Sequence, residues 1–225
     1  MKCYKGIFIL VSVVFLMIIL IAFGCKKNEK PPTIADVDGN DYLIVTIDNQ
    51  VWMAENLRTT KYNDSSSIPN LVTNNDWNGS STPAYCWYDN DPAANKLSYG
   101  ALYNIYAVTT SKLCPTGWHV PNDADWTSLI NYLGGGSAAL GKLMETGSKY
   151  WGKNTLANNE SGFSGLPGGY RGAGFNNQGG AAYWWSSTVG DTYNTMSSHF
   201  ELTDSALLTK SPIGSFGYSV RCLKN

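Results

Sequence analysis

The sequence predicts an α+β domain that is rich in loops. Strand-like runs of β-branched and aromatic residues lie on both sides of a middle section whose apolar residues follow helical spacing. The chain contains 23 glycines, which favour tight turns, and 14 tyrosines and 8 tryptophans, which favour a packed core. Charged residues make up 15% of the chain, whereas disordered chains combine high charge with few aromatic residues. We therefore expect a folded domain.

The N-terminus has the layout of a secretory signal. Two lysines precede an uncharged apolar run over residues 7–23, which ends in the sequence A-F-G-C at residues 22–25. This ending resembles a lipobox, the site at which bacterial lipoproteins are cleaved before a cysteine that receives lipid. We therefore predict a lipoprotein signal peptide over residues 1–24 and lipid attachment at Cys25. A retained transmembrane helix is the alternative, since roughly 17–25 apolar residues span a bilayer.

These features predict a location in the cell envelope, and we expect the outer membrane, with the lipid as the membrane contact. Residues 25–35 are polar and contain a proline pair, which predicts an extended, lipid-anchored tether. Residues 36–225 have the usual length of one domain. The chain has 16 Lys and Arg residues against 17 Asp and Glu, so we expect no nucleic acid partner. The sequence leaves the oligomeric state and the membrane face open.

The clearest helix follows Pro121. Asn122 is a favourable N-cap, and aspartates in the first turn suit the helix dipole. Apolar residues then recur at spacings of three and four, which places them on one helix face. A second, shorter helix is expected over residues 138–144. The apolar face of the first helix consists of Trp126, Leu129, Ile130 and Leu133.

Strands are expected where β-branched and aromatic residues cluster. The segment between residues 59 and 82 is rich in serine and asparagine and is expected to be a loop. The sequence D-V-D-G-N-D at residues 36–41 starts like a calcium loop, but its glycine comes too early, so we expect a turn. The predicted strands cover residues 43–47, 51–53, 84–88, 183–188, 198–202, 206–210 and 218–223.

The chain has five cysteines. Cys3 leaves with the signal, and Cys25 carries the lipid. The remaining three are Cys86, Cys114 and Cys222, in a compartment where disulfides persist. Because this number is odd, at most one disulfide forms within the chain, and the residues alone leave its partners open.

No motif in the sequence carries strong catalytic or metal-binding chemistry. The two histidines, His119 and His199, have no second ligand at the spacing of a zinc site. There is no phosphate-binding glycine loop and no G-x-S-x-G nucleophile motif. We therefore predict that the chain is not an enzyme and that it needs no cofactor or metal ion.

The glycine-rich segment at residues 168–180 is the expected place for any ligand contact. It supplies arginine and asparagine side chains for directional hydrogen bonds, and a nearby strand supplies tryptophan rings for stacking. The alternative is structural, because glycines permit turns and adjacent tryptophans on a strand face opposite sides of the sheet. The candidate residues are Arg171, Asn176, Asn177, Trp184 and Trp185.

Several segments occur in a specific order between Asp36 and Leu223. They include D-V-D-G-N-D-Y, N-Q-V-W-M-A-E-N-L-R-T-T-K-Y, C-P-T-G-W-H-V-P-N-D-A-D-W, Y-W-W-S-S-T and G-Y-S-V-R-C-L. Together they resemble the Fibrobacter succinogenes major paralogous domain family, which covers nearly the whole predicted domain. The resemblance implies an envelope or secreted protein with a C-type lectin-like fold, in which two short helices pack on twisted antiparallel strands.

The resemblance also implies a disulfide between Cys114 and Cys222. In C-type lectin-like folds a bridge commonly joins the region near the first helix to the last strand. Cys86 is then a buried free thiol among aromatic residues, and pairing of Cys86 with Cys222 is the rival. The sequence D-S-A at residues 204–206 resembles an O-glycan acceptor, which suggests modification of Ser205, with a plain turn as the alternative.

The resemblance implies a fold more than a function. The calcium-dependent sugar motifs of true C-type lectins are absent, and Cys222 has no neighbouring cysteine such as the formylglycine-generating enzymes use. Our first hypothesis is a non-catalytic binding or adhesion module for a glycan or an envelope protein. The alternative is an enzyme of formylglycine-generating-like fold or an accessory to polysaccharide degradation.

Overall fold

The computed structural model describes residues 31–152, 156–190, 196–203, 206–212 and 216–225. The predicted signal peptide, Cys25, most of the tether and Ser205 lie outside the described residues. Within these ranges, no helix is long and apolar enough to cross a membrane.

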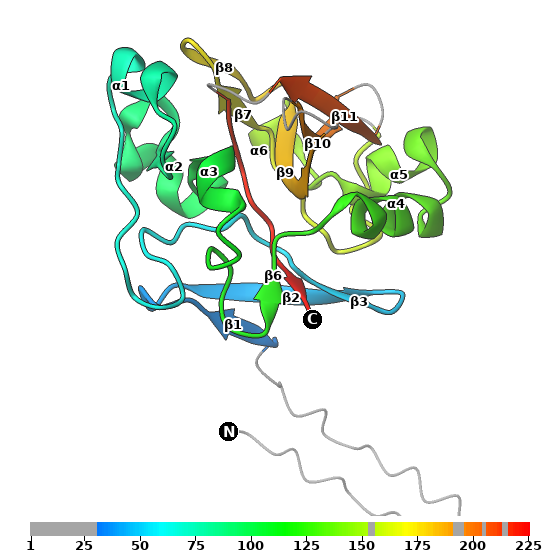
Figure 1. Ribbon diagram of the computed structural model, residues 1–225. Helices are drawn as coiled ribbons and strands as arrows, with labels where there is room; N and C mark the ends of the chain where they lie inside the picture. Colours follow the sequence, from blue (N-terminus) through cyan, green and yellow to red (C-terminus); the bar gives the residue numbers. More distant parts are fainter. Residues whose placement is uncertain (1–30, 153–155, 191–195, 204–205, 213–215) are drawn as a thin grey trace, which may run out of the picture. The chain divides into compact units, whose positions relative to one another are not determined.

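The smaller sheet joins the two ends of the domain. Its strands pair antiparallel in the order β1-β2-β3-β13-β6, so the first strands of the domain lie beside its last strand (Figure 1). The β2–β3 hairpin agrees with the predicted strands at residues 43–47 and 51–53. The strands are β1 (Thr33–Ala35), β2 (Asp41–Ile47), β3 (Gln50–Met53), β6 (Trp118–His119) and β13 (Leu223–Lys224).

The larger sheet has the order β11-β10-β9-β7-β12-β5-β4, with β8 paired to β7. The pairs are antiparallel except β7 with β9. The fold is therefore a mixed α/β domain with largely antiparallel sheets. The strands are β4 (Tyr85–Cys86), β5 (Leu102–Asn104), β7 (Gly168–Arg171), β8 (Phe175–Gln178), β9 (Ala182–Val189), β10 (Met196–Leu202), β11 (Ala206–Pro212) and β12 (Gly217–Tyr218).

The predicted strand at residues 218–223 is wrong as one continuous element. Tyr218 ends β12 in the larger sheet, and Leu223 begins β13 in the smaller one. Between them the chain crosses from one sheet to the other, and its backbone bonds to both sides. The N–H of Trp185 donates to Ser219, and the N–H of Leu57 donates to Val220. The C-terminal segment is thus a link between the two sheets.

The helices lie between residues 74 and 151, in the middle of the chain as predicted, but they outnumber the predicted two. Helix α4 is confirmed, and its N-cap Asn122 forms a capping box with Asp125. Helix α1 occupies part of the expected loop at residues 59–82. The helices are α1 (Asn74–Gly79), α2 (Pro92–Tyr99), α3 (Ile105–Val108), α4 (Asp123–Tyr132), α5 (Gly136–Leu143) and α6 (Ser148–Trp151), and a 3-10 turn spans Tyr88–Asn90.

The core beneath helix α4 is built from aromatic rings. Trp52 of the hairpin and Trp126 of the helix lie 4.8 Å apart between ring centroids. Phe163 and Trp184 complete this cluster, at 5.6 Å from each other. Rings of this size bury large areas, so they fix the hairpin against the helix. Figure 1 shows helices α4 and α5 on the same side of the domain as the tip of this hairpin.

The predicted disulfide between Cys114 and Cys222 is confirmed. The two Cα atoms lie 5.9 Å apart, within the range that a disulfide permits. Cys86 is a buried free cysteine, so the rival pairing of Cys86 with Cys222 is wrong. The predicted turn near Asp36 is also confirmed, since its carboxylate accepts hydrogen bonds from the backbone N–H groups of Asp38 and Asn40 at 2.9 and 3.0 Å.

Candidate functional site

Arg171 does not face a ligand, contrary to one sequence-based expectation. Its guanidinium is buried and donates to the backbone carbonyls of residues 71, 72 and 73 at 2.6, 3.0 and 2.9 Å. It also packs between the rings of Trp77 and Phe175, at 4.6 and 4.9 Å from their centroids. The structural alternative therefore holds for this residue, because its donors are directed into the protein.

The two tryptophans of β9 are both core residues. Trp184 donates its ring N–H to Asn56 at 2.8 Å, and Trp185 donates its ring N–H to the Tyr103 carbonyl at 2.6 Å. Both side chains are buried, so the expectation that one of them stacks on a ligand is wrong. Asn176 and Asn177 are exposed, but without the arginine and the tryptophans they do not form the predicted site.

Asn56 and Arg221 form a buried polar centre that the sequence did not single out. The Asn56 side-chain oxygen accepts from Arg221 Nε and Nη2 at 3.3 and 3.0 Å. Arg221 also donates to the carbonyls of Phe163 and Ser164. Burial lowers the pKa of Arg221 to about 9, and Glu55 opposes this shift, so the guanidinium stays charged at neutral pH. These residues join the last segment of the chain to the hairpin.

One surface pocket lies next to this centre, and we call it the arginine pocket. It has a volume of about 280 Å³. Its polar groups already have partners: Glu55 accepts from Leu43 N–H and Arg58 at 2.7 and 3.2 Å, and the Ser164 hydroxyl accepts from Asn159 at 2.8 Å. Few groups therefore remain to recognise a polar ligand. The lining comprises Leu43, Ala54, Glu55, Asn56, Leu97, Ser98, Glu145, Tyr150, Ser164, Leu166 and Arg221.

A smaller pocket of about 120 Å³ lies beside the disulfide, and His119 and Ser187 are among its lining residues. The pair does not form a general base and nucleophile, because both ring nitrogens of His119 have other partners. Nδ1 lies 2.7 Å from Asn225 Oδ1, and Nε2 lies 3.3 Å from Asp125 Oδ2. Cys86 offers no alternative nucleophile, since burial raises its pKa to about 11 and Arg171 only partly opposes this.

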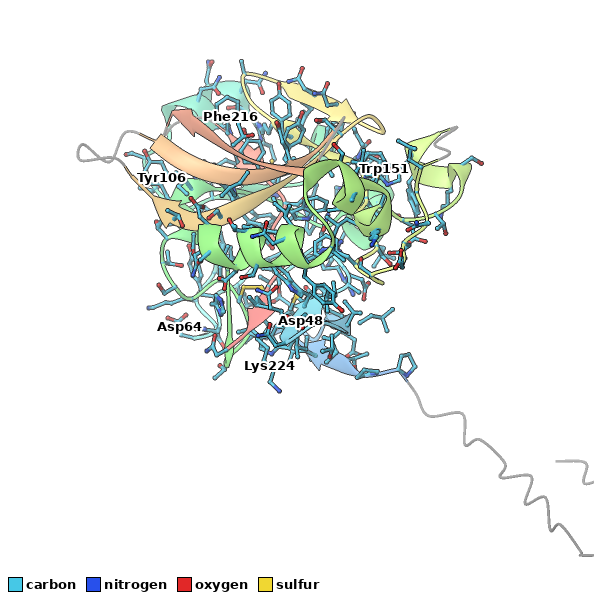
Figure 2. The ribbon with its side chains drawn as sticks, turned by 90° about the vertical axis from the view of Figure 1, so that its right-hand side faces the viewer. Asp48, Asp64, Tyr106, Trp151, Phe216 and Lys224 are labelled. Atoms are coloured by element: carbon cyan, nitrogen blue, oxygen red, sulfur yellow. A yellow bond between two sulfur atoms is a disulfide. The ribbon has the colours of Figure 1, made fainter. Side chains whose placement is uncertain are left out.

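The third pocket lies between the tip of the β2–β3 hairpin and the ends of helices α4 and α5, and we call it the hairpin pocket. It has a volume of about 370 Å³. Figure 2 shows Asp48 at the hairpin tip, below the green helices. Ile47 and Leu133 are buried and form an apolar floor. The lining comprises Thr46, Ile47, Asp48, Tyr132, Leu133, Lys142, Glu160 and Ser161.

The hairpin pocket combines an exposed aromatic ring with polar side chains that have no partner among the described residues. Within the described residues, no hydrogen bond or ion pair engages the side chains of Thr46, Asp48 or Tyr132. Tyr132 is 58% exposed, so its ring is open to solvent. Lys142 and Glu160 form a loose ion pair of 3.8 Å. An exposed ring beside unused donors and acceptors is the arrangement that a polar ligand with an apolar face requires.

The sequence alone does not indicate this site, because its parts come from four separate segments. Tyr132 could have been found, since it lies outside the apolar stripe of a helix that was predicted. Asp48 lies between the predicted strands at residues 43–47 and 51–53, where the sequence indicates only a turn. Nothing local in the sequence indicates that Glu160 approaches either of them.

These observations define the class of protein as a disulfide-linked α/β domain with a surface pocket that an exposed tyrosine and unpaired polar side chains line. The chain matches the family model of the Fibrobacter succinogenes major domain over residues 45–224. This match covers most of the chain, so the chain belongs to that family. No curated protein and no solved structure matches it.

Proposed function

We propose that this protein is a non-catalytic binding module of the bacterial cell envelope, and that the hairpin pocket binds a glycan. The observation that carries the proposal is the exposed ring of Tyr132 beside polar side chains that have no partner in the described structure. A pyranose ring has one face of C–H groups and a rim of hydroxyls. An aromatic ring packs against the face, and carboxylates and hydroxyls bond to the rim.

The other parts of this proposal rest on the sequence and the disulfide. The signal-like N-terminus with Cys25 supports anchoring by lipid. The bridge between Cys114 and Cys222 supports a location outside the cytoplasm, because disulfides persist in oxidising compartments. We also propose that the fold is C-type lectin-like. The pairing of the first strands with the last strand, and the bridge to the C-terminal segment, support this assignment.

The test is a glycan screen with the full-length protein in a neutral detergent, followed by titration of the strongest binder. Tyr132→Ala should weaken binding about tenfold, which corresponds to about 1.4 kcal/mol, because the stacking ring is lost. Tyr132→Phe should keep most of the affinity, since the ring remains.

Leu97→Ala is the control, because Leu97 is 79% exposed and lies outside the hairpin pocket. Equal binding by wild type and Tyr132→Ala, or no binding to any carbohydrate, would contradict the proposal.

A further inference from the structure

Asp48 provides an unpaired carboxylate at the mouth of the hairpin pocket. It lies in the turn after β2 with a φ of 54°, a left-handed conformation that aspartate tolerates better than most residues. The side chain is exposed and has no hydrogen-bond or ion-pair partner among the described residues. An ionised carboxylate only accepts hydrogen bonds. A ligand that bonds to Asp48 must therefore donate the hydrogen bond.

The positive charge in the pocket is already compensated. Lys142 lines the pocket, and its ammonium lies 3.8 Å from a carboxylate oxygen of Glu160. The side chain of Glu160 is 64% exposed, so this carboxylate also borders the open part of the pocket. The lining thus holds two carboxylates against one ammonium. The hydroxyl of Thr46 is a further unused donor and acceptor, and it adds no charge.

We infer that the hairpin pocket selects uncharged sugars, whose neighbouring hydroxyls donate to Asp48, and rejects sugars that carry a carboxylate, such as uronic acids. The inference rests on the proposed function and specifies its ligand. A sugar hydroxyl pair donates two hydrogen bonds to one carboxylate, whereas a sugar carboxylate in the same place meets a like charge, and the described lining residues offer it no unpaired cation. The apolar floor and the Tyr132 ring receive the C–H face of either sugar, so charge decides between them.

The test compares matched oligosaccharides on the full-length protein in neutral detergent. The probes are oligomers of glucuronic, mannuronic and galacturonic acid, each with its carboxyl-reduced, uncharged counterpart. In each pair that shows binding, the uncharged member should bind at least tenfold tighter at low salt. The difference should shrink at high salt, because ions screen exposed charges.

Two substitutions remove the carboxylates without changing the shape of the pocket. Asn tolerates a positive φ as Asp does, so Asp48→Asn should keep the turn. Glu160→Gln should release the Lys142 ammonium from its ion pair. The double variant should bind the acidic oligomers within about threefold of their uncharged counterparts, since the repulsion is gone and a cation is free. Asp89→Asn is the matched control, because Asp89 is also exposed, has a φ of 49° and lies outside the pocket.

The outcomes separate this inference from the proposed function. If acidic and uncharged members bind equally well to the wild type, and Tyr132→Ala weakens both, the pocket binds glycans but the charge selection is wrong. The inference also fails if the double variant keeps the full preference for uncharged sugars. If no member of any pair binds and the glycan screen finds no other carbohydrate that binds, the proposed function and the inference fail together.

Discussion

Arg171 and Arg221 are buried cations that hold backbone segments in place. Within the described part of the chain, neither guanidinium forms an ion pair with a carboxylate. Each instead donates to carbonyl oxygens and lies against aromatic rings, with Arg221 4.1 Å from the centroid of Phe163. Removing Arg171 would leave the Leu71 carbonyl without a donor among the described residues, since the carbonyls of residues 72 and 73 also accept from Asn90 and from the Trp77 N–H. Removing Arg221 would do the same to the carbonyls of Phe163 and Ser164, and an unpaired buried carbonyl is costly.

Arg171→Lys should lower the free energy of unfolding by about 3 kcal/mol, because an ammonium cannot match the planar fork that reaches three carbonyls. Urea unfolding followed by tryptophan fluorescence measures this change. Glycan affinity at temperatures where the variant is folded should stay at the wild-type value. If Arg171→Lys instead lost glycan binding and kept the wild-type free energy of unfolding, Arg171 would belong to the ligand site.

Whether a residue is buried or exposed was predictable where the residues next to it in the sequence determine this. The helical spacing around Trp126 and Leu129 identified the buried face of α4, and it left Tyr132 outside that face. The role of Arg171 depends on carbonyls about 100 residues away in the chain, at separations of 98 to 100. No local pattern reports such a contact, so the sequence left both a ligand contact and this structural role open for Arg171.

Helix α4, which contributes Tyr132 to the proposed site, is well fixed at both its start and its inner face. Its N-cap Asn122 accepts from the N–H groups of Ala124 and Asp125 at 2.8 and 3.1 Å, and the Asp125 carboxylate accepts from the Asn122 N–H at 2.8 Å. The aromatic core holds the inner face. Tyr132 therefore lies at the end of a rigid element. A ring that stacks on a ligand needs such a fixed position.

Asn122→Ala should destabilise the protein by about 1 kcal/mol, because the first turn loses its side-chain acceptor. Asn122→Asp should restore most of this loss, since aspartate also caps helices and suits the helix dipole. Thermal unfolding of the three proteins tests this ranking. Equal stability of Asn122→Ala and the wild type would show that the cap contributes nothing here.

The short helices were missed because they contain too few turns to show a periodic pattern. Helices α1, α3 and α6 have 6, 4 and 4 residues. Helix α2 did carry a local signal, since Asp91 caps it and Pro92 occupies its first turn. The break in the predicted strand at residues 218–223 had no such signal, because the alternating pattern of a strand does not show that a chain changes sheets.

At the scale of the whole molecule, the two ends of the domain are tied together. The smaller sheet places β13 beside β3, and the disulfide joins Cys222 to Cys114 across a separation of 108 residues. In the entropic model a bridge over a loop of this length stabilises the fold by about 4–5 kcal/mol. The family resemblance predicted this pairing correctly, although the residues alone left the partners open.

The hairpin pocket is a product of the whole fold. The hairpin tip, the end of α4, helix α5 and the turn at Glu160 contribute to it from positions spread between residues 46 and 161. The sequence predicted the hairpin and both helices but not how they pack together. Only their packing shows which polar side chains form hydrogen bonds within the protein and which remain available to a ligand.

Hydrogen–deuterium exchange of the full-length protein, with and without the strongest uncharged glycan, tests the central claim most directly. Binding in the hairpin pocket should slow exchange in peptides that cover residues 46–50, 130–134 and 158–162, because the ligand restricts local opening there. The glycine-rich segment at residues 168–180 should be unchanged. Protection confined to residues 168–180, with none at the hairpin, would contradict the account and place the glycan elsewhere.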